Sequence, residues 1–219
     1  MSGHFSADNI GDVSKRVPGA EPDAFAFDAQ SNAEIEKILA KYPAGRQASG
    51  VLPLLYLVQA QMRRDTGSAW VPRVAMDVVA ARLSMPPIRV YEVATFYFMF
   101  NTRPIGRHHL QVCTTTPCWL RGSDDVVAAC RKATGIKGWG ETSADGLFTM
   151  TEVECIGACV NAPILQINDD FYEDVDFRIT EELLETLKHG GELPKPGSMT
   201  GRVTSAPAGG PNTLTSVTE

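Results

Sequence analysis

The chain has 219 residues, of which 43% are hydrophobic and 21% are charged, as in an ordinary soluble protein rather than a disordered or disulfide-stapled one. Its formal net charge of −6 argues against a nucleic-acid-binding protein, which would need a basic face. No apolar run approaches the roughly 20 residues that cross a bilayer. We therefore expect a cytoplasmic protein without direct membrane insertion, long enough for one good-sized domain or two smaller ones.

The first part of the chain, residues 1–25, mixes small and polar residues without periodicity, and we expect a flexible extension there. It lacks the apolar segment of a secretory signal. Its acidic residues Asp8, Asp12 and Glu21 weigh against a transit peptide.

Four helices are predicted over residues 26–100, which we expect to form a helical bundle domain. The first begins at Ser31-Asn-Ala-Glu34, which has the form of a capping box. The second is apolar around much of its circumference, as expected for a central helix, and has Pro53 in its first turn. The third follows Trp70-Val-Pro72, and the fourth follows Ser84-Met-Pro-Pro87.

The fourth helix leads into an aromatic run, Tyr91-Glu-Val-Ala-Thr-Phe-Tyr-Phe-Met-Phe100. Apolar stripes at helical spacing usually mean core packing. This run is denser in aromatic residues than one helix face requires, however, and aromatic residues and Met are enriched at protein interfaces. Core packing and contact with a partner therefore both remain open for this run.

After residue 100 the period changes. His108-His-Leu-Gln-Val112 alternates as a strand does and ends at Cys113. Adjacent strand residues point to opposite faces, so the two histidines are expected to be strand residues rather than ligands of one metal ion. Pro117 begins a predicted helix that runs to about Thr134, and Phe148-Thr-Met-Thr-Glu-Val153 predicts the next strand.

The rest of the chain predicts a hairpin of two strands, Ile164–Ile167 and Phe171–Val175, and a last helix capped by Thr180. Residues 101–193 are therefore compatible with a thioredoxin-like α/β domain. The fold class is α+β, with the helical bundle first. The segment 194–219 is rich in Pro, Gly, Ser and Thr and is expected to be a disordered tail.

Four of the five cysteines form two separated pairs, Cys113 with Cys118 and Cys155 with Cys159, with spacings C-x4-C and C-x3-C. Paired zinc ligands prefer two intervening residues. Iron–sulfur clusters are also held by four thiolates, and C-x4-C is among the spacings they use. The leading interpretation is a [2Fe–2S] cluster held by these four residues, with Cys118 near a helix N-terminus that favours a thiolate.

Other interpretations of the cysteines remain open. Free structural thiols are common, thiolates also bind zinc, and a redox dithiol would more usually have the spacing C-x-x-C. Structural disulfides would need an oxidising compartment. Cys130 lies in a helical pattern and is expected to be a core residue.

Groups near the cysteines are expected to tune a cluster through hydrogen bonds to its sulfur atoms. Gly157 is expected to allow close backbone approach or a positive φ, and Trp119 to shield the site from water. The candidate hydrogen-bond donors are the hydroxyls and amides of Thr114, Thr115 and Thr116 and the N–H groups around Gly157 and Ala158.

The segments Cys113-Thr-Thr-Thr-Pro-Cys118-Trp-Leu-Arg-Gly122 and Glu152-Val-Glu-Cys155-Ile-Gly-Ala-Cys159-Val-Asn-Ala-Pro163-Ile-Leu-Gln-Ile-Asn168 closely resemble the thioredoxin-like [2Fe–2S] ferredoxin subunit of NADH:quinone oxidoreductase, respiratory complex I. The resemblance runs from about Phe27 to about Gly191 and includes the preceding helical region.

The resemblance implies one [2Fe–2S] cluster on this chain, next to the electron route from NADH through FMN, both of which are bound by a partner flavoprotein subunit. It also implies contact of the helical region with that subunit, a neighbouring iron–sulfur subunit, and a location peripheral to the inner membrane. Two alternatives remain open. One is the equivalent subunit of an NAD-linked hydrogenase or formate dehydrogenase; the other is a zinc or thiol thioredoxin-like interaction protein.

Overall fold

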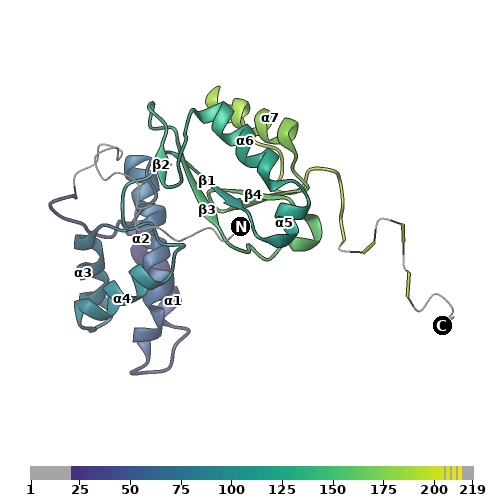
Figure 1. Ribbon diagram of the computed structural model, residues 1–219. Helices are drawn as coiled ribbons and strands as arrows, with labels where there is room; N and C mark the ends of the chain where they lie inside the picture. Colours follow the sequence, from purple (N-terminus) through teal and green to yellow (C-terminus); the bar gives the residue numbers. More distant parts are fainter. Residues whose placement is uncertain (1–20, 205, 208, 211, 214–219) are drawn as a thin grey trace. The chain divides into compact units, whose positions relative to one another are not determined.

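The computed structural model describes residues 21–204, 206–207, 209–210 and 212–213, so most of the expected N-terminal extension lies outside the described residues. The predicted α+β fold, with helices before the sheet, is confirmed (Figure 1). The described chain divides into two compact units. We call residues 21–108 and 142–149 the helical unit, and His109–Glu141 together with residues from Met150 onward the sheet unit. The expected domain limits at residues 100 and 193 remain predictions.

The helical unit contains the four expected helices. They pack around α2, whose Leu54, Leu55 and Val58 are fully buried. Within the described part of the chain no helix has the length and apolar character to cross a membrane. The elements are α1 (Ala29–Leu39), the 3-10 turn η3 (Gln47–Gly50), α2 (Val51–Thr66), α3 (Arg73–Arg82) and α4 (Pro87–Phe96).

The predicted capping box at Ser31 is wrong, because α1 begins two residues earlier. Asp28 is the N-cap residue, and its Oδ1 accepts a hydrogen bond of 2.6 Å from the Ser31 N–H. A carboxylate at this position satisfies the first-turn N–H group, so Ser31 is free to be buried as a helix residue. The Arg64 guanidinium also pairs with Asp28 at 2.7 Å.

Two buried glutamines of α2 hold the segments on either side of the helices. Gln61 accepts from the Asp28 N–H at 3.0 Å and donates to the Ala26 carbonyl at 2.9 Å. Gln59 accepts from the Asn101 N–H at 2.7 Å and donates to the Met99 carbonyl at 3.2 Å. The two side chains thus fix the entry to α1 and the loop after α4.

The sheet has the strand order β2-β3-β1-β4-β5-β6. The predicted hairpin is confirmed: β4 and β5 are antiparallel, and Asn168 turns between them with φ +56°. Strand β1 pairs with β4 in antiparallel register, Val112 opposite Leu165. The strands are β1 (His108–Cys113), β2 (Glu141–Thr142), β3 (Phe148–Val153), β4 (Ile164–Ile167), β5 (Asp170–Glu173) and β6 (Gly197–Ser198).

The helix predicted from Pro117 to Thr134 is two helices, α5 (Thr116–Leu120) and α6 (Ser123–Thr134). Gly122 separates them with φ +102°, a left-handed conformation that interrupts helical geometry and that glycine adopts readily. Helix α6 lies beside α7 over the strands of the sheet unit (Figure 1). The ammonium group of Lys132 joins the two helices through an ion pair of 2.5 Å with Glu181.

The predicted cap of the last helix is also wrong. The N-cap residue of helix α7 (Phe177–Lys188) is Asp176, whose Oδ1 accepts a hydrogen bond of 2.7 Å from the Ile179 N–H. Thr180 lies inside the helix and is fully buried. Beyond α7, β6 pairs in parallel with β5, within the range expected to be a disordered tail.

Candidate functional site: a four-thiol centre

The four cysteines of the two predicted pairs lie at the ends of regular elements of the sheet unit. Cys113 is the last residue of β1, and Cys118 is the third residue of α5. Cys155 follows β3, and Cys159 begins the short turn η4 (Cys159–Asn161). Two adjacent strands of one sheet therefore lead into the two cysteine-bearing segments.

The two pairs differ in burial. Cys113 and Cys118 are each 1% exposed and pack with Ala162 and Ile164 in a small apolar cluster. Cys155 is exposed, and Cys159 is partly exposed. The centre thus has one pair inside the sheet unit and one pair facing outward.

The structure brings all four sulfur atoms into one neighbourhood. The Sγ atoms of Cys155 and Cys159 are 3.3 Å apart, and the side chains of Cys113 and Cys118 hydrogen-bond to each other. Cys159 is close enough to both members of the buried pair to act on them electrostatically. The sequence predicted this grouping from spacing alone.

The buried pair is electrostatically asymmetric. Burial, followed by the hydrogen bond with Cys113, raises the pKa of the Cys118 thiol to about 12. Burial acts in the same direction on Cys113, but hydrogen bonds from the side chain and N–H of Thr115 and from other neighbours outweigh it and lower the pKa of that thiol. The hydrogen bond with Cys155 raises the pKa of Cys159. Without a bound metal, Cys113 is therefore the more easily deprotonated thiol of the buried pair. The prediction that a helix N-terminus favours a thiolate at Cys118 is wrong, because burial outweighs it.

Several predicted neighbours of the centre have definite roles. The Thr115 hydroxyl lies 3.3 Å from Cys113 Sγ, and the Ile156 N–H also bonds to that sulfur. The Thr114 hydroxyl instead donates to the Glu152 carboxylate at 2.6 Å. Gly157 has φ +90°, as predicted.

Trp119, which was predicted to shield the centre, is 58% exposed, and its shielding of the centre stays a prediction. It follows the buried Cys118 in α5, and Leu120 beside it is also exposed. Val160, which follows Cys159, is exposed as well. Each of the two cysteine-bearing segments therefore places a large apolar side chain at the surface directly after a cysteine.

Cys130 is separate from the centre. It is fully buried in α6, and burial raises the pKa of its thiol to about 12. The prediction that it is a core residue is confirmed.

The donor set fits a [2Fe–2S] cluster. Among the described residues, no three or more His, Cys, Asp or Glu side chains form a group suited to a single metal ion. The thiols come instead as two pairs, and two thiolates on each of two irons is the donor set of this cluster. A positive-φ glycine and N–H and O–H groups next to the sulfurs are also what such a cluster needs around it.

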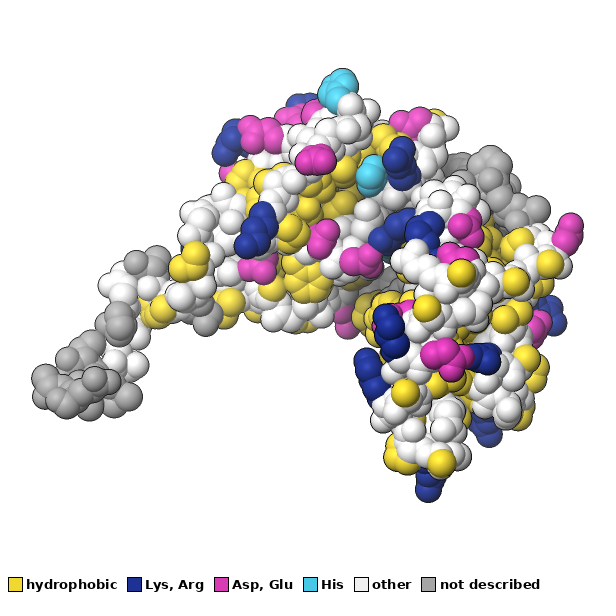
Figure 2. Space-filling view, turned by 180° about the vertical axis from the view of Figure 1, so that it is seen from behind, with side chains coloured by type: hydrophobic (Ala, Val, Ile, Leu, Met, Phe, Trp, Pro, Cys, Tyr) yellow, Lys and Arg dark blue, Asp and Glu magenta, His cyan; other side chains and the backbone are white. Residues whose placement is uncertain are grey.

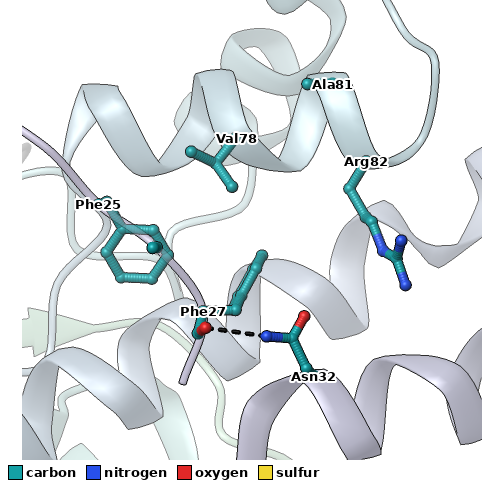
Figure 3. Close-up of a pocket in the computed structure, with 7 residues that line it drawn as sticks. Phe25, Phe27, Asn32, Val78, Ala81 and Arg82 are labelled. Atoms are coloured by element: carbon teal, nitrogen blue, oxygen red, sulfur yellow. Dashed lines mark hydrogen bonds between the residues drawn. The ribbon is translucent and has the colours of Figure 1, made fainter. Parts of the chain in front are cut away.

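A second candidate feature is a pocket of about 510 Å³ in the helical unit, lined mainly by Phe25, Phe27 and Val78 (Figure 3). The two rings meet edge to face, 5.2 Å apart. The amide of Asn32 donates to the Phe27 carbonyl at 2.8 Å, and Arg82 is paired with Glu36. The polar groups of the lining are thus engaged within the unit, and they include no nucleophile with an adjacent base.

The helical unit also exposes large apolar side chains. Phe96 and Phe98 are each 78% exposed, although the same run ends in Phe100, which is buried and packs edge to face on Tyr56. We call the set the aromatic patch; its members are Tyr56, Ile88, Phe96, Tyr97, Phe98 and Met99. Core packing is therefore confirmed for Phe100, and contact with a partner stays a prediction for the exposed residues of the run.

The fold and the paired thiols define a small α+β protein with a four-cysteine centre. The family described as thioredoxin-like [2Fe–2S] ferredoxin matches residues 35–188, and the chain belongs to this family.

The curated relatives match over most of the chain. The chain is 48% identical over 165 residues to the E subunit of NADH-quinone oxidoreductase from Rickettsia bellii, covering 75% of this chain and 95% of the relative. It is also 48% identical over 165 residues to the mitochondrial NADH dehydrogenase [ubiquinone] flavoprotein 2 of Dictyostelium discoideum, covering 75% of this chain and 64% of that protein.

Among solved structures, an NAD+-reducing [NiFe]-hydrogenase in the H2-reduced state has a similar fold, with a TM-score of 0.55 and 22% identity. The match covers 67% of this chain but only 23% of the hydrogenase chain. At this identity the likeness concerns the fold alone.

Proposed function

We propose that this chain is the [2Fe–2S] electron-transfer subunit of an NADH dehydrogenase module of the complex I type. In this proposal Cys113, Cys118, Cys155 and Cys159 hold the cluster. The chain exchanges single electrons with the FMN of a partner flavoprotein subunit, which also binds NADH. The observation that carries the proposal is the gathering of the four thiols in a chain 48% identical to a subunit of NADH-quinone oxidoreductase.

The cluster, when bound, supplies one-electron redox chemistry. The residues of this chain do the rest. Cys113 and Cys118 anchor the centre on the inner side, where the apolar side chains of Ala162 and Ile164 pack against them and exclude water. Cys155 and Cys159 lie on the outer side, where a partner's cofactor can approach. The exposed side chains after the cysteines, such as Trp119, offer apolar area for such a contact.

The exposed apolar surfaces and the names of the relatives support two protein partners. We propose that the aromatic patch and the exposed side of the thiol centre both contact the flavoprotein subunit, and that a further iron–sulfur subunit lies next to the module. The association with the inner membrane is then indirect, through the assembled complex. The hydrogenase likeness is one of fold and does not favour the hydrogenase assignment over complex I.

The test is spectroscopic. The anaerobically purified chain is examined by visible absorption and low-temperature EPR before and after dithionite, with iron, sulfide and zinc assayed on the same sample. We expect red-brown absorption, near-equal iron and sulfide, and a rhombic EPR signal after reduction only. A colourless protein with stoichiometric zinc after anaerobic cluster reconstitution would contradict the proposal.

The ligand assignment has a matched control within the chain. Cys→Ala at each of the four proposed positions should abolish or strongly reduce cluster binding, because alanine offers no ligand atom. Cys130→Ala is the matched control, because it removes the same thiol group from a buried cysteine of α6 that lies outside the centre. It should leave the visible absorption and EPR spectra unchanged. An intact spectrum in any of the four variants removes that residue from the ligand set.

A further inference from the structure

The outer cysteine loop, residues 155–159, is anchored to the sheet through Asn161. The Asn161 side-chain amide donates to Glu173 Oε2 at 2.5 Å, and the Asn161 backbone carbonyl accepts from the Asp174 N–H at 2.7 Å. Asn161 ends the turn η4 that Cys159 begins. The position of Cys159 therefore depends on how β5 ends.

The end of β5 is held in turn by the C-terminal segment 197–202, which we call the strap. Asp174 follows β5 with φ +54°, and its side chain is only 10% exposed. Its carboxylate accepts from the hydroxyls of Ser198 at 2.5 Å and Thr200 at 3.3 Å, and Arg202 lies 4.0 Å away. A carboxylate with this many donors fixes the unusual backbone at Asp174.

Ser198 is the centre of the strap. Its Oγ donates to Asp174 and accepts from the N–H groups of Thr200 and Arg202 at 3.3 and 3.1 Å. In the parallel pairing of β5 and β6, Ser198 lies opposite Glu173. The Met199 N–H donates to the Glu173 backbone carbonyl at 2.9 Å. The strap thus holds both residues that contact Asn161.

We propose that the strap is a positioning element for the outer cysteine pair, acting on Cys155 and Cys159 through Asp174, Glu173 and Asn161. The consequence for the cluster rests on the proposed function, because only a bound cluster makes the placement of the pair matter. The coupling itself is a property of the polypeptide. Asn161 and Ser198 are positioning residues, since their side chains bond to Glu173 and Asp174 and act on the sulfur atoms only through the backbone.

The coupling is tested in the full-length, cluster-free chain by hydrogen–deuterium exchange of peptides spanning residues 155–162. The variant Asn161→Ala should speed exchange in these peptides by roughly two- to tenfold, the effect of losing one hydrogen bond from a local opening equilibrium. The variant Ser198→Ala with Arg202→Ala removes several interactions of the strap and should speed exchange by at least as much. Peptides of α6 should be unchanged, which separates positioning from general destabilisation. The variant Ser198→Thr keeps the hydroxyl group and should therefore exchange in the loop as slowly as the wild type.

The control for the strap variants is Val203→Ser, which alters an exposed residue directly after the strap. It should leave exchange in the loop unchanged. Wild-type exchange in residues 155–162 for both the strap variant and Asn161→Ala would overturn the proposal.

The consequence for the cluster is measured on the reconstituted full-length protein. Loss of visible absorbance on addition of an iron chelator should be roughly two- to tenfold faster in the strap variant than in the wild type. Its EPR g-values should also shift, while Val203→Ser behaves as the wild type. Failure of the wild type to take up iron and sulfide would refute the proposed function, whereas unchanged exchange in the loop would refute the coupling.

Discussion

The hydroxyl of Thr115 lies 3.3 Å from Cys113 Sγ. If Cys113 binds the cluster as proposed, its sulfur is a thiolate without a proton, and the hydroxyl would be the donor. Reduction adds negative charge to the cluster sulfurs, and a donor at this position stabilises the reduced form more than the oxidised one. Thr115 is therefore expected to raise the reduction potential of the centre.

We predict that Thr115→Val lowers the reduction potential by about 20–60 mV, which corresponds to a hydrogen bond of about 0.5–1.5 kcal/mol in a one-electron couple. The potential is measured by EPR-monitored redox titration. Thr115→Ser keeps the hydroxyl and serves as the control. Equal potentials for the Val and Ser variants would show that the hydroxyl has no influence.

At the residue scale, the spacing of the cysteines predicted which of them pair, and the helical pattern around Cys130 predicted that it is a core residue. The C-x4-C and C-x3-C pairs and the helical setting of Cys130 are local patterns. The exposure of Trp119 could not be predicted in this way, because it depends on which side of the short helix α5 packs against the rest of the sheet unit. The contact of Asn161 with Glu173 depends on strand pairing between distant segments and has no local signal.

At the element scale, the caps of the helices were harder to predict than the helices themselves. Ser31 and Thr180 both have good capping chemistry, but an aspartate three or four residues earlier takes the role in each case. A charged carboxylate is a strong acceptor for first-turn N–H groups. The serine and the threonine are then available for burial.

This difference gives a paired prediction for α7. Asp176→Ala should destabilise the chain by about 1 kcal/mol, because the Ile179 N–H loses its acceptor. Thr180→Val should be neutral or stabilising, because Thr180 Oγ1 is buried without a hydrogen-bond partner among the described residues. Urea unfolding measures both. The opposite order would restore Thr180 as the cap.

The cap of α1 predicts a pH dependence. Hydrogen bonds from Ser31, with help from Arg64, lower the pKa of Asp28 to about 2 from its ordinary 3.8. Because the pKa of Asp28 is lower in the folded chain than in the unfolded chain, the ionised carboxylate stabilises the fold at pH values above 3.8. This contribution to the free energy of unfolding is lost as the pH falls from 3.8 to about 2.

In urea titrations Asp28→Asn should therefore be less stable than the wild type at pH 7, and the difference should shrink between pH 4 and pH 2. Asparagine is a suitable comparison because it caps helices about as well as aspartate but carries no charge. A difference that is independent of pH over this range would show that the charge of Asp28 does not contribute.

At the scale of the whole molecule, the surface is mixed in charge and locally apolar. Figure 2 shows acidic and basic side chains intermixed, with hydrophobic side chains reaching the surface between them. In the helical unit, Phe98 and Met99 of the aromatic patch lie in the loop after α4, and Gln59 fixes the backbone of this loop through hydrogen bonds to Met99 and Asn101. Large exposed aromatic side chains on a fixed loop are suited to binding a protein partner.

We predict that Phe96→Ser or Phe98→Ser lowers the recovery of a co-expressed flavoprotein subunit by about tenfold in affinity purification, as expected for a central interface aromatic. The absorption spectrum of the variant chain should stay that of the wild type. Val203→Ser also changes an exposed apolar residue, in the sheet unit, and should have no effect. Full recovery with both phenylalanine variants would exclude the patch as the docking surface.

The helical unit is built from two separate stretches of chain. Within it, the Ser68 hydroxyl donates to the Ile105 carbonyl at 2.7 Å, and the Gly106 N–H donates to Thr149 Oγ1 at 2.6 Å. A side chain at Gly106 would collide with the backbone of Phe148. A gene fragment that stops at residue 100 would therefore encode the helices without the segments that bond to Ser68 and to one another in the same unit. Anyone grafting these helices onto another protein would have to carry residues 101–108 and 142–149 along with them.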